Sequence, residues 1–179
     1  LPVDAWRIVD NIHQNWHPKF SISFIGTGRL HESINRLLVQ LSAFSGLNND
    51  NMARETDWLF LKIGRSLERA LNLIALLRAT LVPYFKPSVE AQMFETVLAT
   101  SNSLITYRRR YRSFMQLPMI LELLLCDANY PRALAYQLRQ LQRMIGELPQ
   151  GQFIDQATDC ARIKEIFADL SRIDPQHLL

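Results

Sequence analysis

Residues 60–81 read FLKIGRSLERALNLIALLRATL. Within this stretch, apolar residues recur at alternating spacings of three and four, which is the period of one face of an α-helix. The apolar positions are Phe60, Ile63, Leu67, Ala70, Ile74, Leu77 and Leu81. Pro83 and Pro87 follow, and proline cannot continue a helix. The spacing therefore predicts one long amphipathic helix that ends near Leu81.

A second apolar stripe with the same period follows the two prolines. Its members are Met93, Val97, Thr100, Leu104, Tyr107, Tyr111 and Phe114. This spacing predicts a second long helix from residue 93 to residue 114. Two amphipathic helices joined by a short turn pack most simply as an antiparallel pair. We expect these two to form a central antiparallel helix hairpin.

The rest of the chain also favours helices. Leucine occurs 28 times and valine only six times, and no segment shows the alternation typical of a strand. Further helices are expected over residues 4–16, 29–44, 118–126, 131–148 and 155–170. Gly46 is expected to stop the second of these, with a turn at 48–50. The predicted fold class is all-α, a helical bundle of about six to seven helices, and residues 1–179 are expected to form a single helical domain.

Composition and residue spacing argue against a membrane-spanning protein and against a metal-binding protein. The formal net charge is +3, and no apolar run approaches the roughly 20 residues of a membrane span. The two cysteines have no metal-binding spacing, and His13 and His17 lack a third ligand at a suitable position. We expect no metal, no cofactor and no membrane partner. No signal peptide opens the sequence, so a cytoplasmic location is expected. Leu1 is not an initiator methionine, so a processed or partial chain is expected.

One acidic residue within the long helix is a candidate site residue. Glu68 shares a stripe with Gly64, Leu71 and Ala75, next to the main apolar stripe. This position predicts a carboxylate that points toward a helix interface, where it needs a cationic partner. Arg65 can reach it from one turn before, and Arg69 lies just outside the same face.

The second long helix carries arginines that could serve as further partners. Arg108 and Arg112 end a stripe that begins apolar, while Tyr107 and Tyr111 lie on the core stripe. We expect Arg108 or Arg112 to meet Glu68 across the hairpin, with a tyrosine hydroxyl completing the network. Such a network could be a buried ion-pair lattice that fixes helix register, a basic pocket for a ligand, or a catalytic site.

Three ordered blocks of sequence resemble one known family. The first runs from Asp57 and Trp58 through Lys62, Gly64, Arg65, Glu68, Arg69 and Ala70 to Leu76, Leu77 and Arg78. The second is residues 106–112, TYRRRYR, and the third is LLLCD at 123–127 with Asn129, Pro131, Arg132 and Ala133. Together they resemble the bacterial alpha-E domain family, a domain of unknown function (403) named for its helices and its Glu-Arg motif. The chain looks like the C-terminal three-fifths of such a domain.

The resemblance implies a partner role. Members of this family are typically encoded beside, or fused behind, a circularly permuted ATP-grasp ligase, often with a transglutaminase-like peptidase. The implied function is a non-catalytic helical module that docks on such a peptide or amide ligase or shapes its substrate site. Binding or docking residues would be Arg65, Glu68, Arg69, Arg108, Arg112 and Arg132, and the implied ligand is an anionic peptide, carboxylate or phosphate.

Two alternatives stay open at this point. The first is an enzyme that uses Glu68 as a general acid or base. The second is a nucleic-acid-binding domain that uses the segment from Tyr107 to Arg112, although two core-facing tyrosines make it a poor reader of nucleic acid. The sequence does not decide whether the chain forms homo-oligomers.

Overall fold

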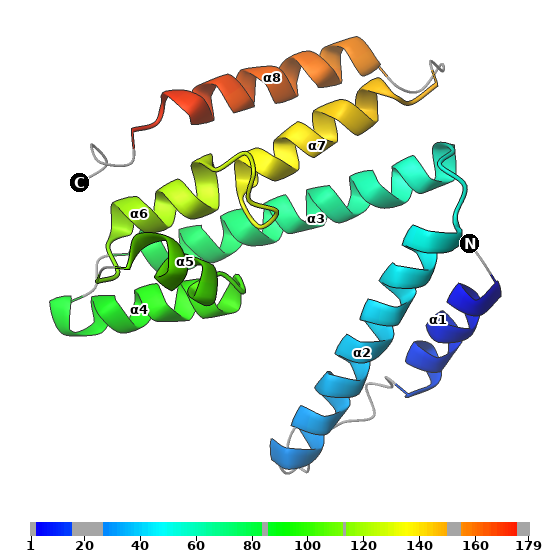
Figure 1. The fold of residues 1–179 in the computed structure, drawn as a ribbon, viewed down its shortest axis with the longest axis horizontal. Coiled ribbons are helices and arrows are strands. Elements are labelled where there is room, and N and C mark those ends of the chain that lie inside the picture. Colours follow the sequence, from blue (N-terminus) through cyan, green and yellow to red (C-terminus); the bar gives the residue numbers. More distant parts are fainter. Residues whose placement is uncertain (1–2, 16–26, 84–85, 113, 150–154, 175–179) are drawn as a thin grey trace. The chain divides into compact units, whose positions relative to one another are not determined.

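The computed structural model describes residues 3–15, 27–83, 86–112, 114–149 and 155–174, and every regular element among them is a helix (Figure 1). The all-α prediction is confirmed. None of these helices combines the length and hydrophobicity needed to cross a bilayer. The chain divides into two compact units, Leu1–Trp58 (unit 1) and Leu59–Leu179 (unit 2). A single domain stays a prediction, because this division does not show whether the units fold independently.

Unit 1 contains two helices that pack against each other. They are α1 (Val3–Asn15) and α2 (Thr27–Asn51), which lie side by side in Figure 1. Ala5 on α1 is fully buried, so its small side chain lets the helices approach closely. Asp4 lies in the first turn of α1 and pairs with Arg7 at 3.3 Å. A negative charge in the first turn is stabilised by the helix dipole.

The end of α2 differs from the prediction. The helix continues through Gly46 to Asn51, so the predicted stop at Gly46 and the turn at 48–50 are wrong. A glycine inside a helix costs only about 1 kcal/mol relative to alanine, which is too little to end a helix by itself. The chain leaves the helix only after Asn51, where the Arg54 guanidinium donates a hydrogen bond to the Asn49 carbonyl at 2.6 Å. This bond satisfies one of the carbonyls that a helix end leaves unpaired.

Replacing Gly46 by alanine is expected to raise the free energy of unfolding by about 0.5–1 kcal/mol. A Cβ at this position meets no atom within 4 Å, and among the described residues no glycine has a positive φ. Urea denaturation followed by circular dichroism measures the change. Gly28→Ala, near the first residue of the same helix, is the control and is expected to have a smaller effect. A destabilised Gly46→Ala variant would contradict a continuous helix here.

Unit 2 is built around the long helix α3 (Thr56–Leu81), whose first turn belongs to unit 1. It is followed by α4 (Pro87–Thr100), α5 (Leu104–Tyr111), α6 (Leu117–Leu121), a π-helical turn η2 (Glu122–Cys126), α7 (Leu134–Gly146) and α8 (Gln156–Arg172). In Figure 1, α4 turns back along the last turns of α3, and α7 and α8 lie side by side. The predicted hairpin is therefore present, but its returning arm is shorter than expected.

The returning arm is short because the predicted helix over 93–114 is broken at Ser101–Ser103. Asn102 has a left-handed backbone with φ of 53°. The Ser103 N–H bonds to the Leu98 carbonyl at 2.7 Å, and the Asn102 N–H bonds to the Ala99 carbonyl at 2.9 Å. This pair of bonds is the Schellman motif that ends many helices, and asparagine is one of the few residues that tolerate its left-handed position. The prediction of one continuous helix was wrong because this local signal was missed.

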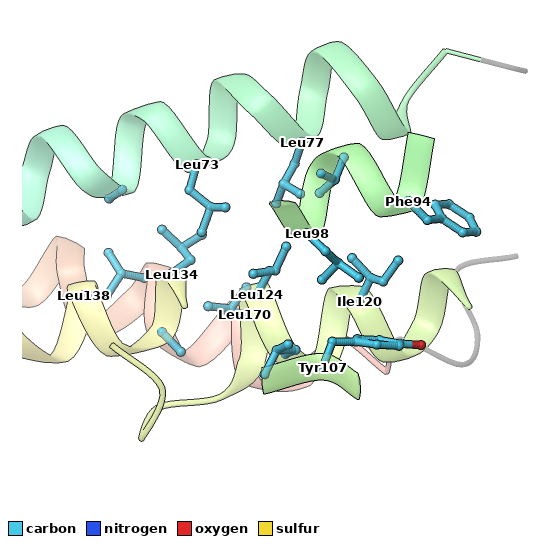
Figure 2. Close-up of a cluster of buried hydrophobic side chains, with 14 residues drawn as sticks. Leu73, Leu77, Phe94, Leu98, Tyr107, Ile120, Leu124, Leu134, Leu138 and Leu170 are labelled. Carbon is cyan, nitrogen blue, oxygen red and sulfur yellow. The ribbon is translucent and has the colours of Figure 1, made fainter. Parts of the chain in front are cut away.

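The core of unit 2 is an apolar cluster that draws on every helix of the unit (Figure 2). Its buried members are Ala70, Leu73, Leu77, Phe94, Val97, Leu98, Tyr107, Ile120, Leu123, Leu124, Leu134, Ala135, Leu138 and Leu170. Figure 2 shows Leu73 and Leu77 of α3 pointing into the layer that holds Leu98 and Leu134. Burial of this much apolar surface is the main source of stability for the unit.

The buried face of α3 is rotated from the predicted one. Its buried residues are Leu59, Ser66, Ala70, Leu73 and Leu77, whereas Phe60 and Leu67 are 50% and 44% exposed. The helix carries two neighbouring apolar stripes that share Ala70 and Leu77, and α4 and α7 cover only one of them. Sequence period alone does not distinguish two stripes that overlap in this way.

The remaining helices agree with the predicted ranges to within about two residues, except at the start of α7. Helix α6 and η2 together occupy the predicted 118–126 segment, with Pro118 in the first turn. Asp155 caps α8 by accepting the Thr158 N–H at 3.1 Å. By contrast, α7 begins at Leu134 and not at Pro131. The Asp127 carboxylate holds residues 127–133 in a turn instead, by accepting the Asn129 N–H at 2.8 Å.

Candidate functional site

Unit 2 contains a pocket of about 270 Å³ bounded by α3, the end of α4 and the start of α7. Its walls combine two guanidinium groups, several neutral polar groups and an aliphatic surface. The lining residues are Arg69, Asn72, Leu73, Leu76, Thr100, Ser101, Pro131, Arg132 and Gln137. Two of them, Arg69 and Arg132, belong to the predicted binding network.

Helix α3 supplies one wall of the pocket through a single stripe. Arg65, Arg69, Asn72 and Leu76 are spaced by four, three and four residues, which aligns them on one face of the helix. The last three line the pocket, and Arg65 lies one turn before Arg69. This stripe is one residue away from the Gly64–Glu68 stripe that the sequence favoured. The buried face of α3 is rotated away from the Gly64–Glu68 stripe, and this rotation also exposes Phe60 and Leu67.

A second part of the lining comes from the turn before α7 and from α7 itself. Gln137 is 2% exposed, and its Nε2 donates a hydrogen bond to the Pro131 carbonyl at 2.6 Å. This bond fixes the residue next to Arg132 and therefore limits where the Arg132 side chain can lie. Helix α7 begins two residues later, at Leu134.

The guanidinium groups of the pocket have no acidic partner among the described residues. No carboxylate in that part of the chain lies within 4.0 Å of Arg65, Arg69 or Arg132. Partial burial lowers the pKa of Arg69, and the nearby charges of Arg65 and then Arg132 lower it further. Arginine nevertheless stays protonated at physiological pH. The pocket is therefore a place where positive charge is crowded and uncompensated, and an anion would relieve the repulsion.

Glu68 does not have the position predicted for it. Its side chain is exposed, and its carboxylate accepts a 3.5 Å hydrogen bond from the Asn72 amide. No arginine among the described residues pairs with it. The predicted inward carboxylate and its ion-pair lattice are wrong, because the core takes the neighbouring stripe of α3. A Cβ added at Gly64 would meet no atom within 4 Å, so this glycine does not mark a close helix contact either.

The arginines and tyrosines of α5 also lie away from the pocket. Arg108 pairs with Glu95 of α4 at 2.8 Å, and not with Glu68. Arg112 is exposed and ends α5 in a left-handed conformation with φ of 48°. Tyr107 is fully buried in the core, and the Tyr111 ring packs against it with 4.9 Å between ring centroids. Arg108, Tyr107 and Tyr111 contact other residues of unit 2, Arg112 is exposed, and none of the four lines the pocket with Arg69.

Four neutral polar residues that line the pocket were not predicted from the sequence: Asn72, Thr100, Ser101 and Gln137. Asn72 could have been found, because it lies three residues after Arg69 on the same helix face. Thr100 and Ser101 could not have been recognised from the sequence, because they line the pocket only where the Schellman motif ends α4. Gln137 carries no pattern of its own, and only its burial beside Pro131 reveals its role.

The part of the chain that the structure describes contains no candidate metal centre. Their His, Cys, Asp and Glu side chains form no group of three or more suited to bind a metal ion. His17, the second member of the predicted histidine pair, lies outside the described residues. Cys126 and Cys160 are free and half-buried thiols. Burial, followed by the charge of Glu122, raises the pKa of the Cys126 thiol, which opposes nucleophilic reactivity.

Comparison with known proteins gives relatives but no activity. The chain is 36% identical over 112 residues to uncharacterized proteins of Mycobacterium bovis and Mycobacterium tuberculosis. The matched segment is 63% of this chain but 13% of each relative, so the chain corresponds to a small part of those proteins. No solved structure matches the chain.

The family match covers the whole chain. Residues 1–179 match the Alpha-E family, which is described as a predicted alpha-helical domain with a conserved ER motif. The sequence contains one Glu-Arg pair, Glu68-Arg69. The arginine of this pair lines the pocket, whereas the glutamate faces solvent. The chain therefore belongs to the Alpha-E family.

Proposed function

We propose that this chain is a non-catalytic, anion-binding helical module of a ligase system of the ATP-grasp type. Its basic pocket would bind a carboxylate or phosphate group and present it to a ligase that is carried in the same longer protein or encoded as a neighbour. The matched relatives are much longer than this chain, which agrees with a module that serves other domains. The resemblance described above supplies the expectation of an ATP-grasp partner.

One observation carries the anion-binding part of the proposal. Arg69 and Arg132 line a concave pocket without an acidic partner among the described residues, and Arg65 adds a third positive charge nearby. The side chains of Arg69 and Arg132 are exposed to solvent, which screens part of their repulsion, but neither has a carboxylate partner among the described residues. Guanidinium groups held together around a pocket are suited to bidentate recognition of carboxylate or phosphate.

The two alternative functions have no comparable support. A general acid or base works best in a cleft that adjusts its pKa, and Glu68 is exposed and outside the residues that line the pocket. Nucleic-acid binding through α5 would need stacking aromatics and free arginines. Tyr107 is buried, however, and Arg108 and Arg110 pair with Glu95 and Asp127.

Anion binding is tested by titrating the full chain with inorganic phosphate and with acetate at low ionic strength, followed by calorimetry and by amide chemical shifts. The Arg69→Gln/Arg132→Gln double variant is expected to lose at least about tenfold in affinity, because each charged hydrogen bond contributes about 1.5–3 kcal/mol. Arg78→Gln removes the same charge from an exposed site on α3 outside the pocket, and it should bind as the wild type does. Equal affinity of the double variant and the wild type would refute the proposal.

The partner role needs a separate measurement. The ligase encoded with this chain is assayed with the wild-type chain, the double variant and the Arg78→Gln control. We expect the double variant to reduce ligation while circular dichroism shows an unchanged helical content. Full ligase activity with the double variant, or with the helical chain left out, would argue against a substrate-presenting role.

A further inference from the structure

We infer that the pocket recognises a carboxylate that carries a nitrogen donor on the adjacent carbon and a small aliphatic side chain, as in a free amino acid or the C-terminal residue of a peptide. This inference rests on the proposed anion-binding function and adds the chemical class of the ligand. It follows from three kinds of surface that meet in the one pocket: a cationic wall, an apolar wall and the end of a helix.

The cationic wall selects the carboxylate. Arg69 and Arg132 approach from two different elements, and each presents a planar set of N–H donors that matches the two oxygens of a carboxylate. A phosphate would also satisfy this wall, so the choice between the two anions depends on the other surfaces.

The apolar wall favours a ligand with a hydrocarbon part. Leu73 is buried and Leu76 is half-buried, and both line the pocket beside the charged groups. An inorganic phosphate leaves this aliphatic surface in contact with water, whereas an aliphatic side chain would cover it and gain the hydrophobic contribution. The volume of about 270 Å³ is slightly below the range of about 300–1,000 Å³ typical of small-molecule pockets, so it suits one residue and not a long segment.

The third surface is the C-terminus of α4, and it accounts for the nitrogen donor. Thr100 is the last residue of α4 and Ser101 is its cap, and both line the pocket. The Leu98 and Ala99 carbonyls are already bonded in the Schellman motif, and the Ser101 carbonyl accepts the Ser103 hydroxyl. Within the described residues, the Thr100 carbonyl and hydroxyl are left to accept an N–H from a ligand. The pocket thus combines guanidinium donors with an oxygen acceptor, which matches a carboxylate with a neighbouring ammonium or amide N–H.

The experiment titrates the full chain with a matched set of small probes and follows amide chemical shifts and heat. N-acetyl-leucine has the carboxylate, an amide N–H and the aliphatic group, and leucine has an ammonium group instead of the amide. Isocaproate lacks the nitrogen, leucinamide lacks the carboxylate, and N-acetyl-glycine lacks the aliphatic group. Inorganic phosphate is the anion without any of the other features.

We expect N-acetyl-leucine or leucine to bind at least about tenfold more tightly than isocaproate, N-acetyl-glycine or phosphate, with shifts at Thr100, Ser101 and Gln137. Tighter binding of N-acetyl-leucine than of leucine would indicate a peptide C-terminus, and the reverse would indicate a free amino acid. The Leu76→Asn variant should lose the preference for N-acetyl-leucine over N-acetyl-glycine but keep phosphate binding.

The experiment distinguishes failure of the inferred ligand class from failure of the proposed anion-binding function. If phosphate, isocaproate and N-acetyl-leucine bind equally and all depend on Arg69 and Arg132, the anion site stands and the ligand class inferred here is wrong. If no anion binds, or if leucinamide binds as tightly as leucine, the proposed function itself is wrong. Binding of N-acetyl-leucine that survives in the Arg69→Gln/Arg132→Gln variant would place the ligand elsewhere and refute both.

Discussion

Replacing Tyr107 by alanine is expected to lower the free energy of unfolding by about 3–5 kcal/mol, the cost of removing a large aromatic side chain from a packed core. Tyr107 is fully buried in the apolar cluster of unit 2. Its hydroxyl accepts the Gln116 N–H at 3.1 Å and donates to the Phe114 carbonyl at 3.3 Å. The side chain therefore anchors the segment between α5 and α6 as well as filling the core.

Two milder variants separate packing from hydrogen bonding. Tyr107→Phe keeps the ring but leaves the Gln116 N–H without its acceptor, and it is expected to cost about 1–3 kcal/mol. Tyr111→Phe is the matched control one turn later. The Tyr111 hydroxyl is buried near Glu122 and Arg110 but makes no hydrogen bond of normal geometry within the described residues. Its removal should be neutral or stabilising. Urea denaturation followed by circular dichroism compares the three variants, and a neutral Tyr107→Phe would contradict the anchoring role.

Replacing Asp127 by alanine is expected to lower the free energy of unfolding by about 1–3 kcal/mol. The Asp127 side chain is 16% exposed and pairs with Arg110, which is 45% exposed. It also accepts the Asn129 N–H at 2.8 Å, so its loss frees the turn that leads to Pro131 and Arg132. Most of the effect should come from this turn, because the exposed guanidinium of Arg110 is well solvated. Denaturation of Glu95→Ala provides the comparison, since the Arg108–Glu95 pair is exposed and should contribute less than about 1 kcal/mol.

The same residue makes stability depend on acid pH. Burial raises the pKa of the Asp127 carboxyl, but hydrogen bonds from Arg110 and the Asn129 N–H lower it more, so the net pKa lies below its ordinary value. The folded state therefore binds this proton less readily than the unfolded state. The stability that Asp127 contributes is complete above about pH 4, the ordinary value for aspartate, and is lost as the pH falls through the lower folded value.

Asp127→Asn tests this pH dependence without removing the side-chain shape. The variant should be less stable than the wild type at neutral pH, and the difference should shrink as the pH falls below about 4. Thermal or urea denaturation at a series of acid pH values measures the two curves. Parallel curves for the variant and the wild type would show that Asp127 does not titrate in the way described.

The class of fold is determined by the sequence alone. Leucines at helical spacing and prolines between segments predict helices wherever burial requires one apolar face, and those helices are present. The cap of α8 at Asp155 and the proline in the first turn of α6 follow from local chemistry, which acts over a few residues. Such features can be predicted because the groups that interact are neighbours in the chain.

The site was decided by tertiary structure. Arg69 and Arg132 were recognised as candidates from the sequence, but their common pocket depends on how α3 rotates and where α4 ends. The apolar residues of α3 form two overlapping stripes that share Ala70 and Leu77, and packing against α4 and α7 buries only one of them. That choice turns Glu68 to solvent and brings Arg69 into the pocket, because a rotation of the buried face by only part of the roughly 100° between successive residues changes which side chains border it.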